Sequence, residues 1–209
     1  MLFLQEEITE RVISLLRGTM AQLMVGDPQY LETDVGPVID AAALQQLQLH
    51  VERLQTEGKL VYQLPLDDHL SPGHYFAPCV FEIDSLAQLP EEVFGPILHV
   101  IRYPARQLDA VIEAINATGY GLTLGIHTRI ETRARYIQQR VRAGNTYFNR
   151  NMIGAVVGMQ PFGGEGLSGT GPKAGGPHYV QRFATEWVFS NNTAAIGGNA
   201  GLLSLRDDG

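Results

Sequence analysis

The sequence predicts an α/β fold, a layered sheet with flanking helices. Two observations lead to this prediction. Segments whose apolar residues recur at helical spacing alternate along the chain with short β-branched and aromatic segments. Such alternation is typical of sheets covered by helices. A chain of 209 residues with 44% hydrophobic content is also long enough to bury a sizeable core.

The expected helices follow the apolar spacing. In the first helix, Ile8, Val12 and Leu15 recur every three to four residues, and Gly26-Asp27-Pro28 ends it. The expected helices are the first twenty-odd residues, a segment that carries Leu44 to Leu54 and ends at Gly58, residues 107–118, residues 131–142, and a short helix at residues 178–183.

The expected strands are rich in β-branched and aromatic residues. They cover residues 75–83 with an interruption at Pro78, then Ile97–Tyr103, 123–127, 146–149, and an exposed strand at 185–191. Trp187 and Phe189 share one face of that last strand, and an unpaired strand edge invites pairing with another chain. We therefore expect residues 1–184 to form one domain and residues 185–209 to form an oligomerisation strand and tail.

Composition and charge exclude several classes of partner. The net charge is −7, and no basic stripe is present to neutralise the phosphates of a nucleic acid. No apolar run approaches the ~20 residues that span a bilayer, and the start of the chain does not resemble a signal peptide. A single cysteine allows no internal disulfide, which fits a cytoplasmic location.

A glycine-rich loop at residues 154–176 is expected to be functional, because long ordered loops in compact domains usually are. It contains the pattern G-x-G-x-x-G at Gly164, Gly166 and Gly169. A phosphate clamp of that pattern needs a strand before it and a helix directly after it, whereas Pro161 precedes it and Gly171-Pro172 follows. The glycines therefore indicate close passage of the backbone past a ligand or another segment.

Cys79 is the only candidate thiol nucleophile. It lies between Pro78 and Val80 in an apolar strand, and buried cysteines are chemically inert. The six histidines form neither a helical i, i+4 pair nor a cluster with cysteine, so the sequence predicts no metal site.

The segment before the second expected strand admits two interpretations. A carboxylate at Glu92, beside the Gly95-Pro96 turn, can accept hydrogen bonds from a ribose diol, and Phe94 can pack against a sugar or a flat ring. The alternative is a solvated acidic turn, and on chemistry alone this alternative is favoured.

Several motifs together resemble the aldehyde dehydrogenase family. The segment EEVFGPILHVIRY at residues 91–103 is similar to the cofactor-ribose motif of that family. Residues 145–179 resemble the subgroup that oxidises glutamate γ-semialdehyde, which is in equilibrium with Δ1-pyrroline-5-carboxylate. Residues 25–28, 33–37 and 119–122 also fit, in the order in which the family carries them.

The resemblance implies roles for five positions. Glu92 matches the glutamate that holds the nicotinamide ribose hydroxyls of NAD, and Phe94 matches its neighbour against the cofactor. Gly154 and Ala155 match the loop whose backbone N–H groups bind the substrate carboxylate. Many relatives have serine at the position of Ala155, so one hydroxyl contact is absent here. Phe162 matches the aromatic residue that packs on the aliphatic part of this small-molecule substrate.

The resemblance also implies that the catalytic domain is incomplete and truncated at the N-terminus. In the family a cysteine thiolate attacks the aldehyde, and that residue lies upstream of the helix that opens this chain. No catalytic residue is therefore assigned, and the chain alone is expected to be inactive. The tail at residues 197–203 resembles the end of a bifunctional proline-utilisation flavoenzyme, so FAD is expected only if a proline dehydrogenase half is attached.

Three hypotheses remain open. The first is a piece of a working NAD-dependent dehydrogenase that self-associates. The second is a non-catalytic module, derived from that family, for oligomerisation or partner binding. The third is an aldehyde dehydrogenase with another substrate. The joint presence of Glu92, Phe94 and the 154–162 loop favours the first hypothesis.

Overall fold

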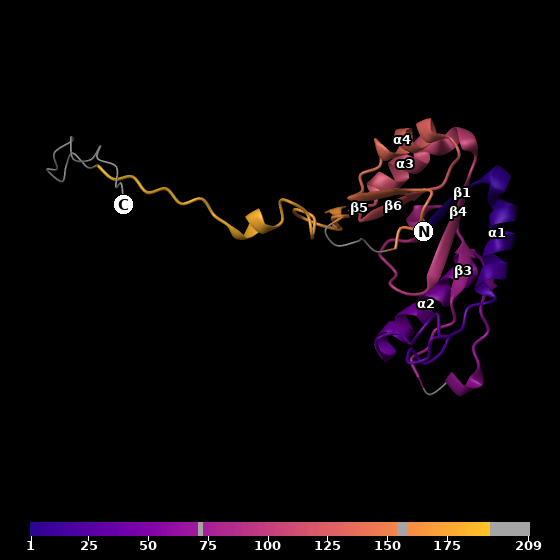
Figure 1. Cartoon of the computed structure of the whole chain (residues 1–209). Coiled ribbons are helices and arrows are strands. Elements are labelled where there is room, and N and C mark those ends of the chain that lie inside the picture. The colour runs from indigo at the N-terminus through magenta and orange to yellow at the C-terminus, as the bar shows by residue number, and fades with distance from the viewer. Residues whose placement is uncertain (71–72, 154–158, 193–209) are drawn as a thin grey trace.

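The computed structural model of the chain describes residues 1–70, 73–153 and 159–192 (Figure 1). Helices and strands up to β7 form one body, and the described chain after the glycine-rich loop extends away from it. Gly154 and Ala155, two of the expected substrate-binding positions, lie outside the described residues.

A four-stranded mixed sheet forms the centre of the body. Its strands, from one edge to the other, are β1 (Leu2–Gln5), β4 (Ile97–Tyr103), β3 (Cys79–Glu82) and β2 (Lys59–Gln63). The first three run parallel, and β2 pairs with β3 in the antiparallel sense. The predicted α/β fold is thus confirmed.

Two helices cover opposite faces of this sheet. α1 (Glu6–Met20) buries Ile13 and Met20 against a cluster that contains Val80 and Val100. α2 (Ala41–Glu57) buries Leu47, Val51 and Leu54 against the alternate residues of the same strands, which include Cys79, Phe81 and Ile101. Successive side chains of a strand point to opposite faces, so β3 and β4 supply both cores.

Sequence signals explain where α2 begins and ends. The carboxylate of Asp40 accepts a hydrogen bond from the backbone N–H of Ala43 at 2.7 Å, which caps the first turn. Gly58 follows the last turn, as its position in the sequence predicts.

A smaller unit packs beside the sheet. It contains the parallel pair β6 (Thr123–Ile126) and β7 (Asn145–Phe148) with α3 (Leu108–Ala117) and α4 (Glu131–Gln138). Asn116, near the end of α3, donates to the carbonyl of Arg140 at 2.8 Å and accepts from the N–H of Arg142 at 2.8 Å. This one side chain fixes α3 against the turn that follows α4.

The short elements lie mostly in the connections. β5 (Tyr120–Gly121) pairs antiparallel with β8 (Glu165–Gly166). There are also short 3-10 helices among the described residues, namely η1 (Asp68–Leu70), η2 (Leu86–Gln88), η3 (Ala105–Gln107) and η4 (Val180–Phe183).

The structure corrects several predicted boundaries. The first apolar residues form β1 rather than a helix, because their backbone pairs with β4. The strand predicted for residues 75–83 is confined to Cys79–Glu82, since Pro78 has no N–H to donate to a ladder. α4 ends at Gln138 instead of residue 142, and the helix predicted at 178–183 is the shorter η4. β2 was not predicted.

The segment of residues 184–192, called the arm here, is extended and exposed (Figure 1). In the described structure it pairs with no strand, so the predicted strand is not formed. Trp187 and Phe189 do share a face, because their rings stack with centroids 6.2 Å apart. The division into a 1–184 domain and a 185–209 tail stays a prediction. None of the described helices is long and apolar enough to cross a membrane.

Candidate functional site

The turn before β4 is held to the body at three points. Val93 packs against the core cluster under α2. Gly95 lies so close to α2 that an added Cβ would come within 2.5 Å of the Leu47 side chain. The carbonyl of Pro96 accepts a hydrogen bond from the N–H of Cys79 at 3.1 Å, which extends the pairing of β3 with β4.

This anchoring leaves Glu92 and Phe94 facing outward. Both are exposed, and 89% of Phe94 is accessible. Glu92 has no hydrogen bond or ion pair with any of the described residues, so its carboxylate oxygens are available to a ligand. An aromatic side chain of this size loses hydrophobic stabilisation when it stays in water, and the fold itself makes no use of it.

Phe162 lies on a segment that pairs with the chain twelve residues later. Its N–H donates to the carbonyl of Ala174 at 3.0 Å, and the N–H of Ala174 donates back at 2.9 Å. The side chain of Asn145, at the start of β7, donates to the carbonyl of Pro161 at 2.9 Å and accepts from the N–H of Gly163 at 3.2 Å. Residues on both sides of Phe162 are thus attached to β7.

The glycines of this region allow backbone segments to touch, as predicted. A Cβ at Gly144 would come within 1.9 Å of the Gly163 carbonyl oxygen, so a larger residue at position 144 would force the two segments apart. Gly166 has a φ of +60° and lies in β8 against Gly119. No helix begins directly after Gly169, so the geometry rejects a phosphate clamp.

The structure brings only some of the predicted site residues together. Glu92 and Phe94 share the turn before β4, whereas Phe162 belongs to the loop after β7. Among the described residues, no hydrogen bond or aromatic contact joins the two groups.

Cys79 is buried in the core, with 1% of its surface accessible. Burial raises the pKa of its thiol to about 12, so the thiolate is scarcely populated near neutral pH. The expectation that Cys79 is buried is confirmed, and its inertness stays a prediction.

Two histidines form a contact that sequence reasoning missed. The Nε2 atoms of His50 on α2 and His99 on β4 lie 2.9 Å apart. Burial, together with the charges of His50, the amino terminus and Arg53, lowers the pKa of His99 to about 4. The described part of the chain places no third histidine, cysteine or carboxylate beside them as a metal ligand.

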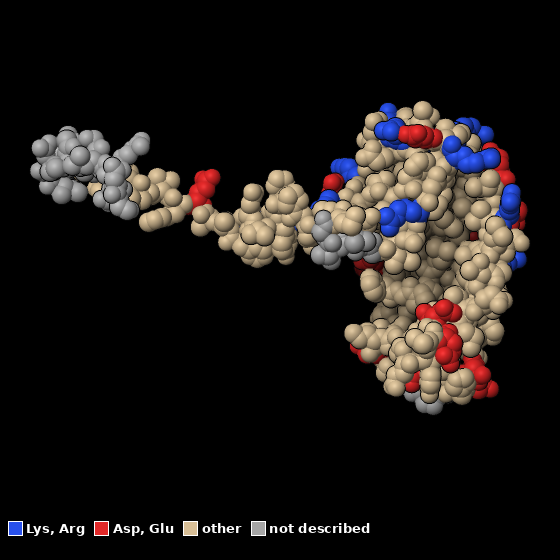
Figure 2. All heavy atoms as spheres, viewed as in Figure 1, with Lys and Arg blue, Asp and Glu red and all other residues tan. Residues whose placement is uncertain are grey.

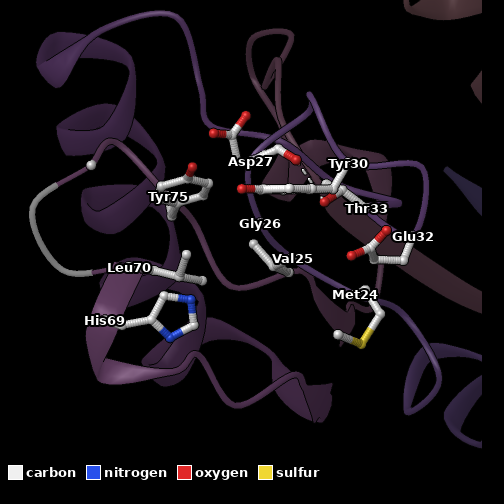
Figure 3. Close-up of a pocket in the computed structure, with 11 residues that line it drawn as sticks. Met24, Val25, Gly26, Asp27, Tyr30, Glu32, Thr33, His69, Leu70 and Tyr75 are labelled. Carbon is white, nitrogen blue, oxygen red and sulfur yellow. Dashed lines mark hydrogen bonds between the residues drawn. The ribbon is translucent and has the colours of Figure 1, made fainter.

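A surface cleft of about 590 Å³ lies between the 24–33 segment and a second group of residues, His69, Leu70, Gly73 and Tyr75 (Figure 3). It occurs at the end of the body where acidic side chains gather (Figure 2). Two of its polar residues already serve the local turn. The Asp27 carboxylate accepts a hydrogen bond from the N–H of Gln29, and the Thr33 hydroxyl donates one to the Asp27 carbonyl. None of the predicted site residues lines this cleft.

Comparison with known proteins identifies the family. A model of the aldehyde dehydrogenase family matches residues 1–188. The bifunctional protein PutA of Klebsiella aerogenes is 49% identical over 186 residues, which are 87% of this chain and 14% of that protein. The 1-pyrroline-5-carboxylate dehydrogenase of Bacillus subtilis is 38% identical over 84% of this chain and 33% of that protein.

Solved structures agree with the sequence comparison. A mutant of proline utilization A from Bradyrhizobium japonicum is 54% identical, with a TM-score of 0.86 over 92% of this chain and 19% of that one. A 1-pyrroline-5-carboxylate dehydrogenase from Thermus with bound NAD is 35% identical, with a TM-score of 0.77 over 87% of this chain and 34% of that one. The chain thus spans about a third or less of its relatives, and it belongs to the aldehyde dehydrogenase family.

Proposed function

We propose that this chain is part of an NAD-dependent dehydrogenase that oxidises L-glutamate γ-semialdehyde to glutamate in proline catabolism. The observation that carries the proposal is the outward presentation of Glu92 and Phe94 on a turn that three other contacts attach to the body. The printed names of the relatives, which include 1-pyrroline-5-carboxylate dehydrogenases, support the same reaction.

Glu92 and Phe94 fit a bound nicotinamide nucleotide. The free carboxylate of Glu92 accepts hydrogen bonds from the two hydroxyls of a ribose, and charge-assisted bonds of this kind are strong. The exposed ring of Phe94 offers an apolar surface beside the sugar. NAD, when bound, takes up the hydride that leaves the aldehyde carbon. The residues of this chain hold and orient the nucleotide for that transfer.

Phe162 is proposed to pack on the methylene groups of the aldehyde. The pairing with Ala174 and the bonds from Asn145 keep its backbone in place. Gly154 and Ala155, which lie outside the described residues, are proposed to bind the substrate carboxylate through their N–H groups.

The thiol that attacks the aldehyde is not supplied by these 209 residues, because Cys79 is buried and is the only cysteine. We therefore propose that the isolated chain is inactive. Removal of a covalent nucleophile lowers turnover by on the order of 10⁶ in a serine protease.

The arm is proposed to mediate self-association. Trp187, Val188 and Phe189 are 73–86% exposed in the described structure, and an extended segment with free backbone groups can pair with a second chain. The exposure of this arm also favours the alternative function, a non-catalytic oligomerisation module. A cytoplasmic location, and FAD where a proline dehydrogenase half is attached, stay predictions.

Two measurements test the proposal. In a chimera, residues 1–188 replace the matching third of the Thermus dehydrogenase. There, Glu92→Ala should slow single-turnover NADH formation by about 10- to 100-fold, with little change in aldehyde binding. Glu91→Ala, the neighbouring exposed carboxylate, is the control. Unchanged NADH formation with Glu92→Ala would contradict the assigned role.

The second measurement is titration calorimetry of the 209-residue chain with NAD. We expect no binding at micromolar concentrations, because one ribose contact does not replace a nucleotide-binding domain. Micromolar affinity would show that this chain carries a larger part of the cofactor site.

A further inference from the structure

Lys173 makes several hydrogen bonds, and the proposed function gives this residue no role. Its ammonium group donates to the carbonyl oxygen of Gly144, to the carbonyl oxygen of Gly163 at 2.9 Å, and to Oδ1 of Asn145 at 3.3 Å. The side chain is half-buried between the loop and β7. Its three donors meet three acceptors, so its hydrogen-bonding capacity is fully used.

A lysine suits this position better than an arginine does. The ammonium is a compact charge whose three N–H groups diverge, whereas a guanidinium is a planar fork that matches flat acceptors. The backbones of Gly144 and Gly163 approach so closely that no Cβ fits between them. The small head of Lys173 therefore fits a ring of acceptors that a guanidinium would force apart.

The contacts of Lys173 join the segment that carries Phe162 to the start of β7. Gly144 directly precedes β7, and Asn145 is the first residue of that strand. Gly163 directly follows Phe162, and Asn145 also holds the carbonyl of Pro161 on the other side. With Lys173 in place, the backbone is fixed immediately before and after Phe162.

We propose that Lys173 is a positioning residue that sets the place of Phe162 against the substrate. This inference rests on the proposed function, since Phe162 meets an aldehyde only if the chain belongs to such an enzyme. Lys173 itself touches neither the substrate nor NAD in this proposal. Its ammonium acts through the carbonyl of Gly163 and the side chain of Asn145.

The chain offers a direct test that needs no activity, because Lys59 and Lys173 are its only lysines. Lys59 is exposed on β2 and serves as the internal reference. Reductive methylation of the 209-residue chain, followed by peptide mass spectrometry, gives the rate at each amine. We expect Lys173 to react at least about tenfold more slowly than Lys59, because its amine is free only when the loop opens. Equal rates would overturn the proposed contacts.

Kinetics of the Thermus chimera test the effect on the reaction. Lys173→Met should raise the KM for glutamate γ-semialdehyde by about tenfold and leave kcat and the KM for NAD within about twofold. Lys173→Arg should not restore the KM, because the guanidinium does not fit. Lys59→Met is the matched control and should change neither constant.

A double-mutant cycle separates positioning from general loosening. Phe162→Ala should itself raise the aldehyde KM, and Lys173→Met should then add less than about twofold. Full additivity of the two changes, or parallel losses in kcat and NAD binding, would overturn the proposal. A parent chimera that folds but forms no NADH would instead overturn the proposed function, while the methylation rates still decide whether Lys173 is held.

Discussion

The contact of His50 with His99 makes the stability of the fold depend on pH in a defined window. One of the two Nε2 atoms must donate and the other must accept across 2.9 Å, so the pair does not tolerate two protonated rings. His99 is 6% exposed, and burial is the main reason that its pKa falls to about 4. An unfolded histidine titrates near 6.5.

The direction and the size of the pH effect on stability follow from the folded and unfolded pKa values of His99. Below pH ~6.5 the unfolded chain takes up a proton at His99, whereas the folded chain does not until the pH approaches about 4. Stability is therefore lost as the pH falls through this window and levels off below it. The difference between the two values corresponds to about 3 kcal/mol of unfolding free energy.

The test compares the wild type with His99→Gln, whose neutral amide keeps a polar partner for His50. Urea unfolding followed by far-UV circular dichroism at pH 7.5, 6.5, 5.5 and 4.5 gives the free energy at each pH. Carboxylates titrate in both proteins, so the difference between them reports on the histidine. We expect the wild type to lose about 2–3 kcal/mol more than the variant. Equal losses would refute the reasoning, and His127→Gln, an exposed histidine, is the control.

Three further predictions concern the core and its charges. The thiol of Cys79 should react with an aromatic disulfide reagent at pH 8 only after urea unfolds the chain, and fast labelling of the native chain would contradict its burial. Glu82→Gln removes the carboxylate that pairs with Arg102, both being mostly shielded, and should lower stability by about 1–2 kcal/mol. Its control, Glu131→Gln in an exposed helical pair, should change thermal stability by less than about 0.5 kcal/mol, and equal effects of the two would show that shielding is irrelevant. Leu54→Ala, at a fully buried position, should cost about 2–5 kcal/mol in chemical denaturation, and a smaller loss would mean that the core refills the cavity.

The sequence predicts strongly patterned elements well and weakly patterned strands poorly. The sequence predicts β4 with its observed bounds, because Ile97–Tyr103 is rich in β-branched residues and follows a Gly-Pro turn. The sequence predicts helix at β1, because its few apolar residues also fit helical spacing, and only pairing with β4 decides between helix and strand. β2 has one buried residue, Val61, among exposed or half-buried neighbours, so its burial pattern gives little indication of a strand.

The same distinction applies to the site. The apolar neighbours of Cys79 predicted its inertness, and the glycines predicted close backbone passage. The contacts of Lys173 cannot be predicted from the sequence, because two of its acceptors are backbone carbonyls and its partners lie 10 to 29 residues away. Every residue has a backbone carbonyl, so residue types do not indicate which carbonyl accepts a hydrogen bond. The contact of His50 with His99 likewise joins positions 49 residues apart.

The arm has a practical consequence for how this protein is observed. Trp187 is the only tryptophan of the chain, and 84% of its surface is accessible in the arm rather than packed in the body. Intrinsic tryptophan emission therefore reports what the arm touches and stays nearly silent when the sheet unfolds, whereas the far-ultraviolet signal comes from the helices and strands of the body. The unlabelled chain thus gives two independent spectroscopic signals, tryptophan emission for association and far-ultraviolet circular dichroism for folding.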